Sequence, residues 1–272
     1  MSLSGKTLFI TGASRGIGRE IALKAATQGA NIVIAAKSAE PHPKLPGTIH
    51  SVAAEVEAAG GKALALKLDV RDEVSVKAAM AQAAAHFGGL AALINNAGAI
   101  RLVGVEQLEP KRYDLMFQIN TRAVMVCSQA ALPYLKQSKG HILSLSPPLS
   151  LAPQWFSSYS PYTTTKYGMS MLTLGMHEEF RKYGISVNSL WPKTVIATAA
   201  IEYEAGGPAV MKASRLPAIM ADAACAILAS ENRSISGRLL VDEEILREQG
   251  QSDFEQYRYD PAGKLMTDLF VD

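Results

Sequence analysis

Cysteine is scarce in this sequence. Cys127 and Cys225 are the only two among 272 residues, and they lie far apart in the chain. Two distant cysteines provide neither a disulfide framework nor a thiolate cluster for a metal ion. We therefore expect two buried, reduced thiols and no metal site.

The sequence also lacks an excess of charge of either sign. Its 27 basic and 25 acidic residues leave a formal net charge of +2. A nucleic-acid-binding protein would need basic residues clustered along one face. We expect no nucleic-acid partner.

Long apolar runs are absent as well. Charged or turn residues interrupt every apolar run before it reaches membrane-spanning length, and the first residues contain no basic region followed by an apolar core. We expect no membrane association, and the cytoplasm is the simplest compartment.

Short apolar runs alternate with segments of helical pattern along most of the chain. The runs fall at residues 6–11, 31–36, 63–68, 90–94, 140–146, 185–191 and 238–241. This alternation predicts an α/β fold of the Rossmann type, a doubly wound parallel sheet of about seven strands with helices on both faces. We expect a single NADP-binding domain over residues 1–272, with residues 243–272 as a polar tail packed on it.

The first predicted strand ends in a glycine-rich turn, residues 11–18, that leads into a predicted helix. Glycines let a phosphate approach the backbone, and a helix N-terminus offers free N–H groups and the positive end of its dipole. The turn therefore predicts a dinucleotide phosphate site. The residues assigned to it are Gly12, Ser14, Arg15, Gly16, Ile17 and Gly18.

The residues after the second strand discriminate between two cofactors. NAD sites of this architecture place an acidic residue there, which would repel the 2′-phosphate of NADP. This chain has Lys37 and Ser38 instead, with Arg15 as a second basic residue. We predict NADP rather than NAD, and the alternative is that both cations are solvated surface charges. The following segment, residues 40–48, contains three prolines and is expected to be a loop.

Polar and small residues follow the third and fourth strands. We assign Asp69, with Val70, to the adenine of the cofactor and Asp72 to the cap of the next helix. The fourth strand runs into Asn-Asn-Ala-Gly, where small residues leave space for a flat ligand at the carboxyl edge of the sheet. Asn96, Ala97 and Gly98 are assigned to the cofactor.

Tyr162 and Lys166 lie four residues apart in a predicted helix, and this spacing puts them on one face. An ammonium beside a phenol lowers the pKa of the phenol, which makes the hydroxyl a usable acid or base near neutral pH. Alternatively, the Tyr162 and Lys166 side chains are only neighbours on a solvated helix surface. Asn120 lies inside another predicted helix, at residues 113–136, where it is either exposed or makes a specific hydrogen bond.

Taken in order, the glycine turn, the Asn-Asn-Ala-Gly run, Asn120 and the Tyr162/Lys166 pair resemble the motifs of the short-chain dehydrogenase/reductase family. The runs that begin at Ala35, Leu145 and Leu190 look like those of the hydroxysteroid-dehydrogenase-like proteins. Some of those relatives carry an additional sterol-carrier domain, and here we expect the reductase domain without it.

The resemblance implies a mechanism. Tyr162 would exchange a proton with a carbonyl or alcohol oxygen while the nicotinamide exchanges hydride with the carbon. Lys166 would lower the pKa of the tyrosine and bind the nicotinamide ribose. Asn120 would hold a water molecule of a proton relay.

Two positions depart from the family pattern. Family members usually carry a catalytic serine thirteen residues before the tyrosine, but Leu149 stands there. We assign the role to Ser146, which precedes Pro147, with Ser144 and Ser157 as weaker candidates. Alternatively, Ser146 only forms hydrogen bonds with backbone groups at the end of a strand. The second departure is Pro192-Lys193, which replaces the usual Pro-Gly. We assign Pro192 and Thr194 to the binding of the nicotinamide carboxamide. Alternatively, these residues only form a turn at the end of a strand.

The sequence therefore predicts an NADP-dependent dehydrogenase or reductase of the EC 1.1.1 type that acts on an apolar carbonyl or alcohol. One alternative is an NADP-binding module with weak or no turnover, because the usual serine position is altered. A second alternative is an enzyme that uses Tyr159 with Lys166, as enoyl reductases do. Enoyl reductases, however, generally lack the Asn-Asn-Ala-Gly run. Relatives pair through the helices predicted at residues 113–136 and 162–183, so we expect a homodimer or homotetramer.

Overall fold

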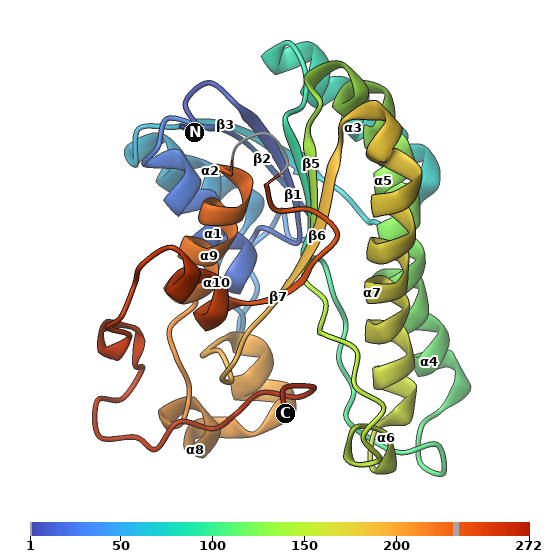
Figure 1. Cartoon of the computed structure of the whole chain (residues 1–272), viewed down its shortest axis with the longest axis vertical. Coiled ribbons are helices and arrows are strands. Elements are labelled where there is room, and N and C mark those ends of the chain that lie inside the picture. The colour runs from blue at the N-terminus through green and yellow to red at the C-terminus, as the bar shows by residue number, and fades with distance from the viewer. Residues whose placement is uncertain (1, 231–233) are drawn as a thin grey trace.

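Seven strands form one parallel sheet in the computed structural model, which describes residues 2–230 and 234–272 (Figure 1). The strands are β1 (Thr7–Thr11), β2 (Asn31–Ala36), β3 (Lys62–Lys67), β4 (Ala92–Asn95), β5 (His141–Ser144), β6 (Ser186–Trp191) and β7 (Leu239–Val241). Their order is β3-β2-β1-β4-β5-β6-β7, and every neighbouring pair is parallel. The predicted doubly wound fold is confirmed. Because the order reverses between β1 and β4, a ligand crevice is expected at their carboxyl ends.

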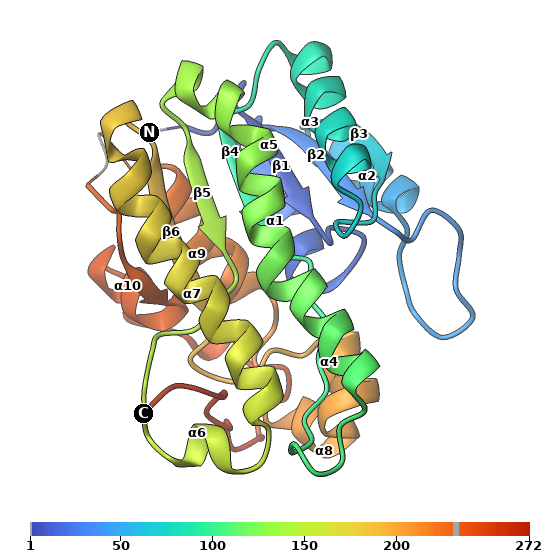
Figure 2. The same cartoon turned by 90° about the vertical axis from the view of Figure 1, so that its right-hand side faces the viewer.

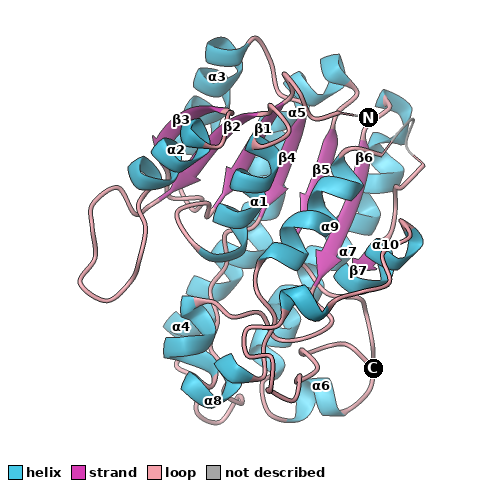
Figure 3. Ribbon diagram, turned by 90° about the vertical axis from the view of Figure 1, so that its left-hand side faces the viewer, coloured by secondary structure: helices cyan, strands magenta, loops and turns pink. Residues whose placement is uncertain are grey.

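Helices cover both faces of the sheet (Figures 1 and 3). On one face lie α1 (Gly16–Ala26), α2 (Ile49–Ala58), α9 (Ala218–Leu228) and α10 (Asp242–Glu248); on the other lie α3 (Glu73–Phe87), α5 (Ala123–Ser138) and α7 (Ser160–Phe180). Each face has its own buried apolar cluster. The sheet therefore separates two cores.

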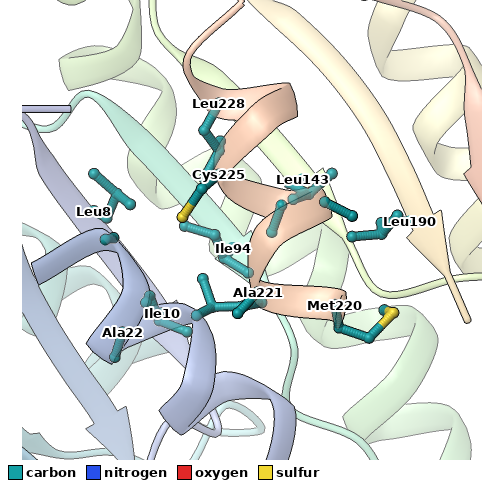
Figure 4. Close-up of a cluster of buried hydrophobic side chains, with 14 of the residues drawn as sticks. Leu8, Ile10, Ala22, Ile94, Leu143, Leu190, Met220, Ala221, Cys225 and Leu228 are labelled. Carbon is teal, nitrogen blue, oxygen red and sulfur yellow. The ribbon is translucent and has the colours of Figure 1, made fainter. Parts of the chain in front are cut away.

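Figure 4 shows how α9 packs on the sheet. Ala221, Cys225 and Leu228 recur at intervals of about one turn, and this side of the helix lies against Ile94 and Leu143 of the central strands. Complete burial of a leucine or isoleucine side chain stabilises the fold by roughly 1.5–3 kcal/mol. Both cysteines are buried and free, as predicted.

The predicted helix at residues 113–136 is longer than expected and interrupted. It consists of α4 (Pro110–Phe117), a π-helical turn η1 (Gln118–Arg122) and α5. Pro110 occupies the first turn, where proline is favoured because its missing N–H has no intrahelical acceptor there. The π turn was not predicted.

Short helical elements occur between β5 and α9. A short helix, α6 (Gln154–Ser157), precedes α7, and the 3₁₀ turn η2 (Arg181–Tyr183) follows it. Residues 197–214, called the lid below, contain η3 (Ile201–Ala205) and α8 (Gly207–Lys212). Residues 40–48 contain no helix or strand, as predicted.

The segment after β7, predicted to be a polar tail, also contains buried apolar side chains. It contains α10 and the 3₁₀ turn η4 (Glu255–Tyr257), and it buries Phe254, Tyr257 and Phe270. Within the described residues, no helix is both long and apolar enough to cross a membrane.

Candidate active site

A cavity of about 1360 Å³ opens along the carboxyl edge of the sheet, between the glycine turn, α4, the start of α7, the lid and the C-terminal segment. The predicted site residues that line it are Gly12, Ser14, Arg15, Gly16, Ile17, Lys37, Asp69, Val70, Asn96, Ala97, Gly98, Tyr162, Lys166 and Pro192. Gly18, Asn120, Ser146 and Thr194 are not part of this lining. Predicted residues from six separate stretches of the sequence thus meet in one cavity.

Two glycines of the turn, Gly12 and Gly18, have no room for a side chain. At Gly12, which has φ +68°, a Cβ atom would lie 2.8 Å from Ala97 Cα, and at Gly18 it would lie 2.4 Å from Asn96 Nδ2. Asn96 Nδ2 donates hydrogen bonds to Thr11 O at 2.8 Å and to Gly12 O at 3.0 Å. The turn is therefore fixed against the end of β4, with the N-terminus of α1 facing the cavity. This arrangement fits a phosphate group.

Basic residues gather beside Ser38 at the end of β2. The Arg15 guanidinium donates to Ser38 Oγ at 3.0 Å and to the carbonyl oxygens of Pro46 and Gly47 at 2.9 and 3.2 Å. Lys37 Nζ lies 3.3 Å from Asp69 Oδ2, and its side chain is 63% exposed. Arg15 thus holds the proline-rich loop next to the site where a 2′-phosphate is expected.

The two aspartates after β3 have different environments. Asp72 Oδ1 accepts hydrogen bonds from the backbone N–H groups of Val74 and Ser75, which confirms its role as the cap of α3. Asp69 instead accepts from the Arg71 guanidinium, with a contact of 2.5 Å at Oδ2. That hydrogen bond, with the Lys37 charge, holds the pKa of the Asp69 carboxyl well below its usual range. Asp69 is therefore an ionised, paired acceptor at the cavity edge, and its contact with adenine stays a prediction.

Tyr162 and Lys166 lie on one face of α7 and are both buried at the cavity wall. Lys166 Nζ donates to Leu145 O at 2.6 Å and lies 4.9 Å from the centroid of the Trp191 ring. Burial lowers the pKa of Lys166 to about 7 and raises the pKa of Tyr162. The expected lowering of the tyrosine pKa is thus absent, because loss of hydration disfavours both charged forms.

Asn120 lies in the π turn and is fully buried. Its Oδ1 accepts from Ala99 N–H at 2.8 Å, while its Nδ2 donates to Ala99 O and to Thr165 Oγ1, both at 2.9 Å. The amide therefore ties the chain after β4 to α7. The predicted role in a water relay stays a prediction.

Ser146 follows β5 and is fully buried. Its hydroxyl has no hydrogen-bond partner among the described residues, and the same is true of Ser144 Oγ and Thr194 Oγ1. Pro147 O accepts from Ser170 Oγ on α7 at 2.6 Å. The hydroxyl of Ser146 is unsatisfied, but it does not line the cavity that Tyr162 lines.

Lys193, the second departure from the family pattern, is held away from the cavity. Its Nζ lies 3.1 Å from Glu243 Oε1, and its N–H donates to Asp242 Oδ1 at 2.9 Å. Its carbonyl oxygen accepts from Asp268 N–H at 3.0 Å. A lysine is therefore accommodated after Pro192, because its side chain leaves for an acidic partner.

The C-terminal segment is a part of the site that the sequence interpretation missed. Residues 266–269 line the cavity, and Phe270 is only 1% exposed, with its ring centroid 6.2 Å from that of Tyr162. Trp191 Nε1 donates to Leu269 O at 2.7 Å. The apolar run at 269–271 is the sequence signal that could have indicated burial.

Comparison with known sequences agrees with this geometry. Residues 6–205 match the family model described as short chain dehydrogenase. Over 271 residues the chain is 54% identical to hydroxysteroid dehydrogenase-like protein 2 of Xenopus laevis, which covers 99% of this chain and 64% of that relative. The human protein of the same name is 53% identical with the same coverage. The chain thus spans less than two thirds of the length of these relatives.

Solved structures show the same fold. The crystal structure of a dehydrogenase from Xanthomonas campestris has a TM-score of 0.96 and 53% identity, with 100% of both chains covered. A short chain dehydrogenase from Burkholderia cenocepacia, solved in complex with NADP, has a TM-score of 0.74 and 30% identity, and covers 89% of this chain and 97% of that one.

Proposed function

The chain belongs to the short-chain dehydrogenase/reductase family of NAD(P)-dependent oxidoreductases, and on this premise we propose that it is an NADP-dependent enzyme that interconverts a carbonyl and an alcohol on an apolar small molecule. The observation that carries the proposal is the position of Tyr162 and Lys166 in the wall of the same cavity as the glycine turn. A bound nicotinamide supplies or accepts the hydride. The protein supplies the proton through Tyr162, with Lys166 beside it.

Support for NADP comes from the end of β2. Arg15, Lys37 and Ser38 surround the expected position of the 2′-phosphate, and no acidic residue directly follows the strand. The NADP complex of the similar Burkholderia cenocepacia enzyme is consistent with this choice.

Support for an apolar substrate comes from the other end of the cavity. The side chains that line it near Tyr162 include Met116, Trp191, Val195 and Leu269. Such a wall favours ligands with little exposed polarity beyond the reacting oxygen.

The alternative of a binding module with little turnover rests on Ser146, which does not line the cavity, and on Leu149, which stands thirteen residues before Tyr162, where the family usually has the serine. A cavity that binds NADPH but lacks a second partner for the substrate oxygen would bind cofactor and react slowly.

One experiment separates these functions. NADPH and NADH are titrated by fluorescence, and a panel of apolar ketones and aldehydes is then assayed with the wild type, Tyr162→Phe and Ser146→Ala. We expect the wild type to reduce at least one compound and Tyr162→Phe to lose about 10²–10⁴-fold in kcat while it binds NADPH normally. Binding of NADPH without turnover of any compound would favour the binding module.

A homo-oligomer is proposed as well. Met171 and Leu174 on α7 are 64% and 38% exposed, and Met125 on α5 is 41% exposed. Exposed methionine and leucine on two neighbouring helices suit an interface with a second copy of the chain.

A further inference from the structure

Residues 266–270 are anchored along the chain that leaves β6. Val195 N–H donates to Met266 O at 3.0 Å, Thr194 and Thr267 form an antiparallel bridge, and Asp268 N–H donates to Lys193 O at 3.0 Å. Backbone contacts therefore fix the path of this segment past the cavity.

Aromatic rings hold the end of the segment in place. The Phe270 ring lies with its centroid 5.3–6.3 Å from five others, those of Trp155, Tyr159, Tyr162, Tyr167 and Trp191. Contacts of this geometry add to the burial of the ring itself. Because Tyr162 belongs to this cluster, the segment and the proposed proton donor are packed as one unit.

This packing brings the carboxyl group of Asp268 to the wall of the cavity that Tyr162 and Lys166 also line. Its Oδ1 accepts from Leu269 N–H at 2.7 Å. No hydrogen bond to Oδ2 is found within residues 2–230 and 234–272. The carboxyl group therefore keeps an oxygen without a hydrogen bond from the described residues, in the wall of the cavity that contains the proposed proton-transfer centre.

We propose that Asp268 is a positioning residue of the proton-transfer centre, whose negative charge acts on Lys166 and Tyr162 and sets the pH at which they release their protons. The proposal rests on the proposed function of this pair. It gives the C-terminal segment a part in the reaction in addition to closing the cavity.

Four titratable groups of the described residues interact electrostatically with Asp268. Tyr162 and Lys166 face it from α7, Tyr159 from the residue before α7, and Asp242 from α10. Burial and the Asp242 charge raise the pKa of Asp268 to about 7, although the hydrogen bond from Leu269 N–H and the Lys166 charge act in the opposite direction. When ionised, Asp268 in turn raises the pKa of both Tyr162 and Lys166. Removing the charge of Asp268 must therefore lower the pKa of Tyr162 and the pKa of Lys166.

The test uses Asp268→Asn, because an asparagine Oδ1 still accepts the Leu269 N–H. We expect the rise of the alcohol-oxidation rate with pH to move to lower pH by on the order of one unit. Lys166 is measured separately, by the pH dependence of its acetylation with acetic anhydride, followed by mass spectrometry of its peptide. We expect this midpoint to move in the same direction.

Asp272→Asn is the matched control, because Asp272 is a carboxylate of the same segment that does not line the cavity and accepts from Trp155 Nε1. Unchanged midpoints in Asp268→Asn relative to this control would overturn the proposal. So would a rate that falls equally at every pH with both midpoints fixed, since that is the signature of a purely structural role. If the wild type turns over no substrate, the proposed function fails and the acetylation midpoint alone decides this inference.

Discussion

Burial dominates the electrostatics of the two proposed proton-transfer residues. Tyr162 and Lys166 share one face of α7, yet loss of hydration raises the pKa of the phenol and lowers that of the ammonium to about 7. The spacing of the pair was readable from the sequence. The pKa values of the two side chains could not be read from the sequence, because they depend on the groups that surround this face of the helix.

Lys37, which follows β2, leads to a prediction about the preference for NADPH over NADH. We expect Lys37→Ala to weaken NADPH binding by about tenfold and to leave NADH binding nearly unchanged, because one charge-assisted hydrogen bond to a phosphate is worth about 1.5–3 kcal/mol and this side chain is exposed. Fluorescence titration of both cofactors measures the ratio.

Lys67→Ala serves as the control, since Lys67 is an exposed lysine at the end of β3 that does not line the cavity. Equal weakening of NADPH and NADH by Lys37→Ala would show that Lys37 does not recognise the 2′-phosphate.

At the scale of elements, Glu243 connects three parts of the structure. From α10, its carboxylate binds Arg215 at 2.6 Å, Arg247 at 2.9 Å and Lys193 at 3.1 Å. Arg215 leads into α9, while Lys193 directly follows the end of β6. The wall near the expected nicotinamide is thus supported by an ion-pair network behind it.

Burial would raise the pKa of Glu243, but hydrogen bonds from Arg215, Arg247 and Lys193 lower it to about 2. A lowered folded pKa stabilises the fold fully above the unfolded pKa, and this contribution is lost as the pH falls towards 2. We expect Glu243→Gln to reduce the free energy of unfolding by about 3–5 kcal/mol at pH 7, and by less at pH 3. Urea denaturation at both pH values measures the difference.

Glu248→Gln removes an exposed pair with Arg238 and should cost at most about 1 kcal/mol. A Glu243→Gln variant that loses the same stability at pH 3 as at pH 7 would contradict the ion-pair account.

The sequence predicted the elements whose causes are local. The strands, the glycine turn, the Asp72 cap and the loop at 40–48 follow from short patterns, and the structure has them close to the predicted bounds. The position of residues 266–270 and the Glu243 network depend on contacts between segments far apart in the chain. No local pattern encodes such contacts, so these parts of the site required the structure.

At the scale of the whole molecule, the side covered by α5 and α7 carries exposed apolar residues. Figure 2 shows α5 and α7 side by side on the face towards the viewer. Met169 and Met176 point into the core, whereas Met171 and Leu174 are exposed. Residues 169–176 of α7 thus pack into the core on one side of the helix and are exposed on the other.

We expect Met171→Glu to reduce the molar mass in solution from that of a dimer or tetramer to that of a smaller species, because a charge at an apolar interface is left without a partner. Light scattering after size-exclusion chromatography measures this. Leu151→Glu is the control, since Leu151 is 84% exposed and lies outside both helices. A wild type that is already monomeric would rule out the proposed interface.

The π turn at Gln118–Arg122 determines how one long helix faces two different regions. Before the turn, Leu115 and Met116 line the cavity; after it, Cys127 and Ala131 are buried against the sheet. A π turn holds one residue more than an α-helical turn, and each residue advances the helix by about 100°. A regular α-helix of the same residues would therefore rotate one half by about 100° relative to the other, so that the cavity wall and the core could not both be correct. The π turn absorbs the additional residue and keeps both faces in place.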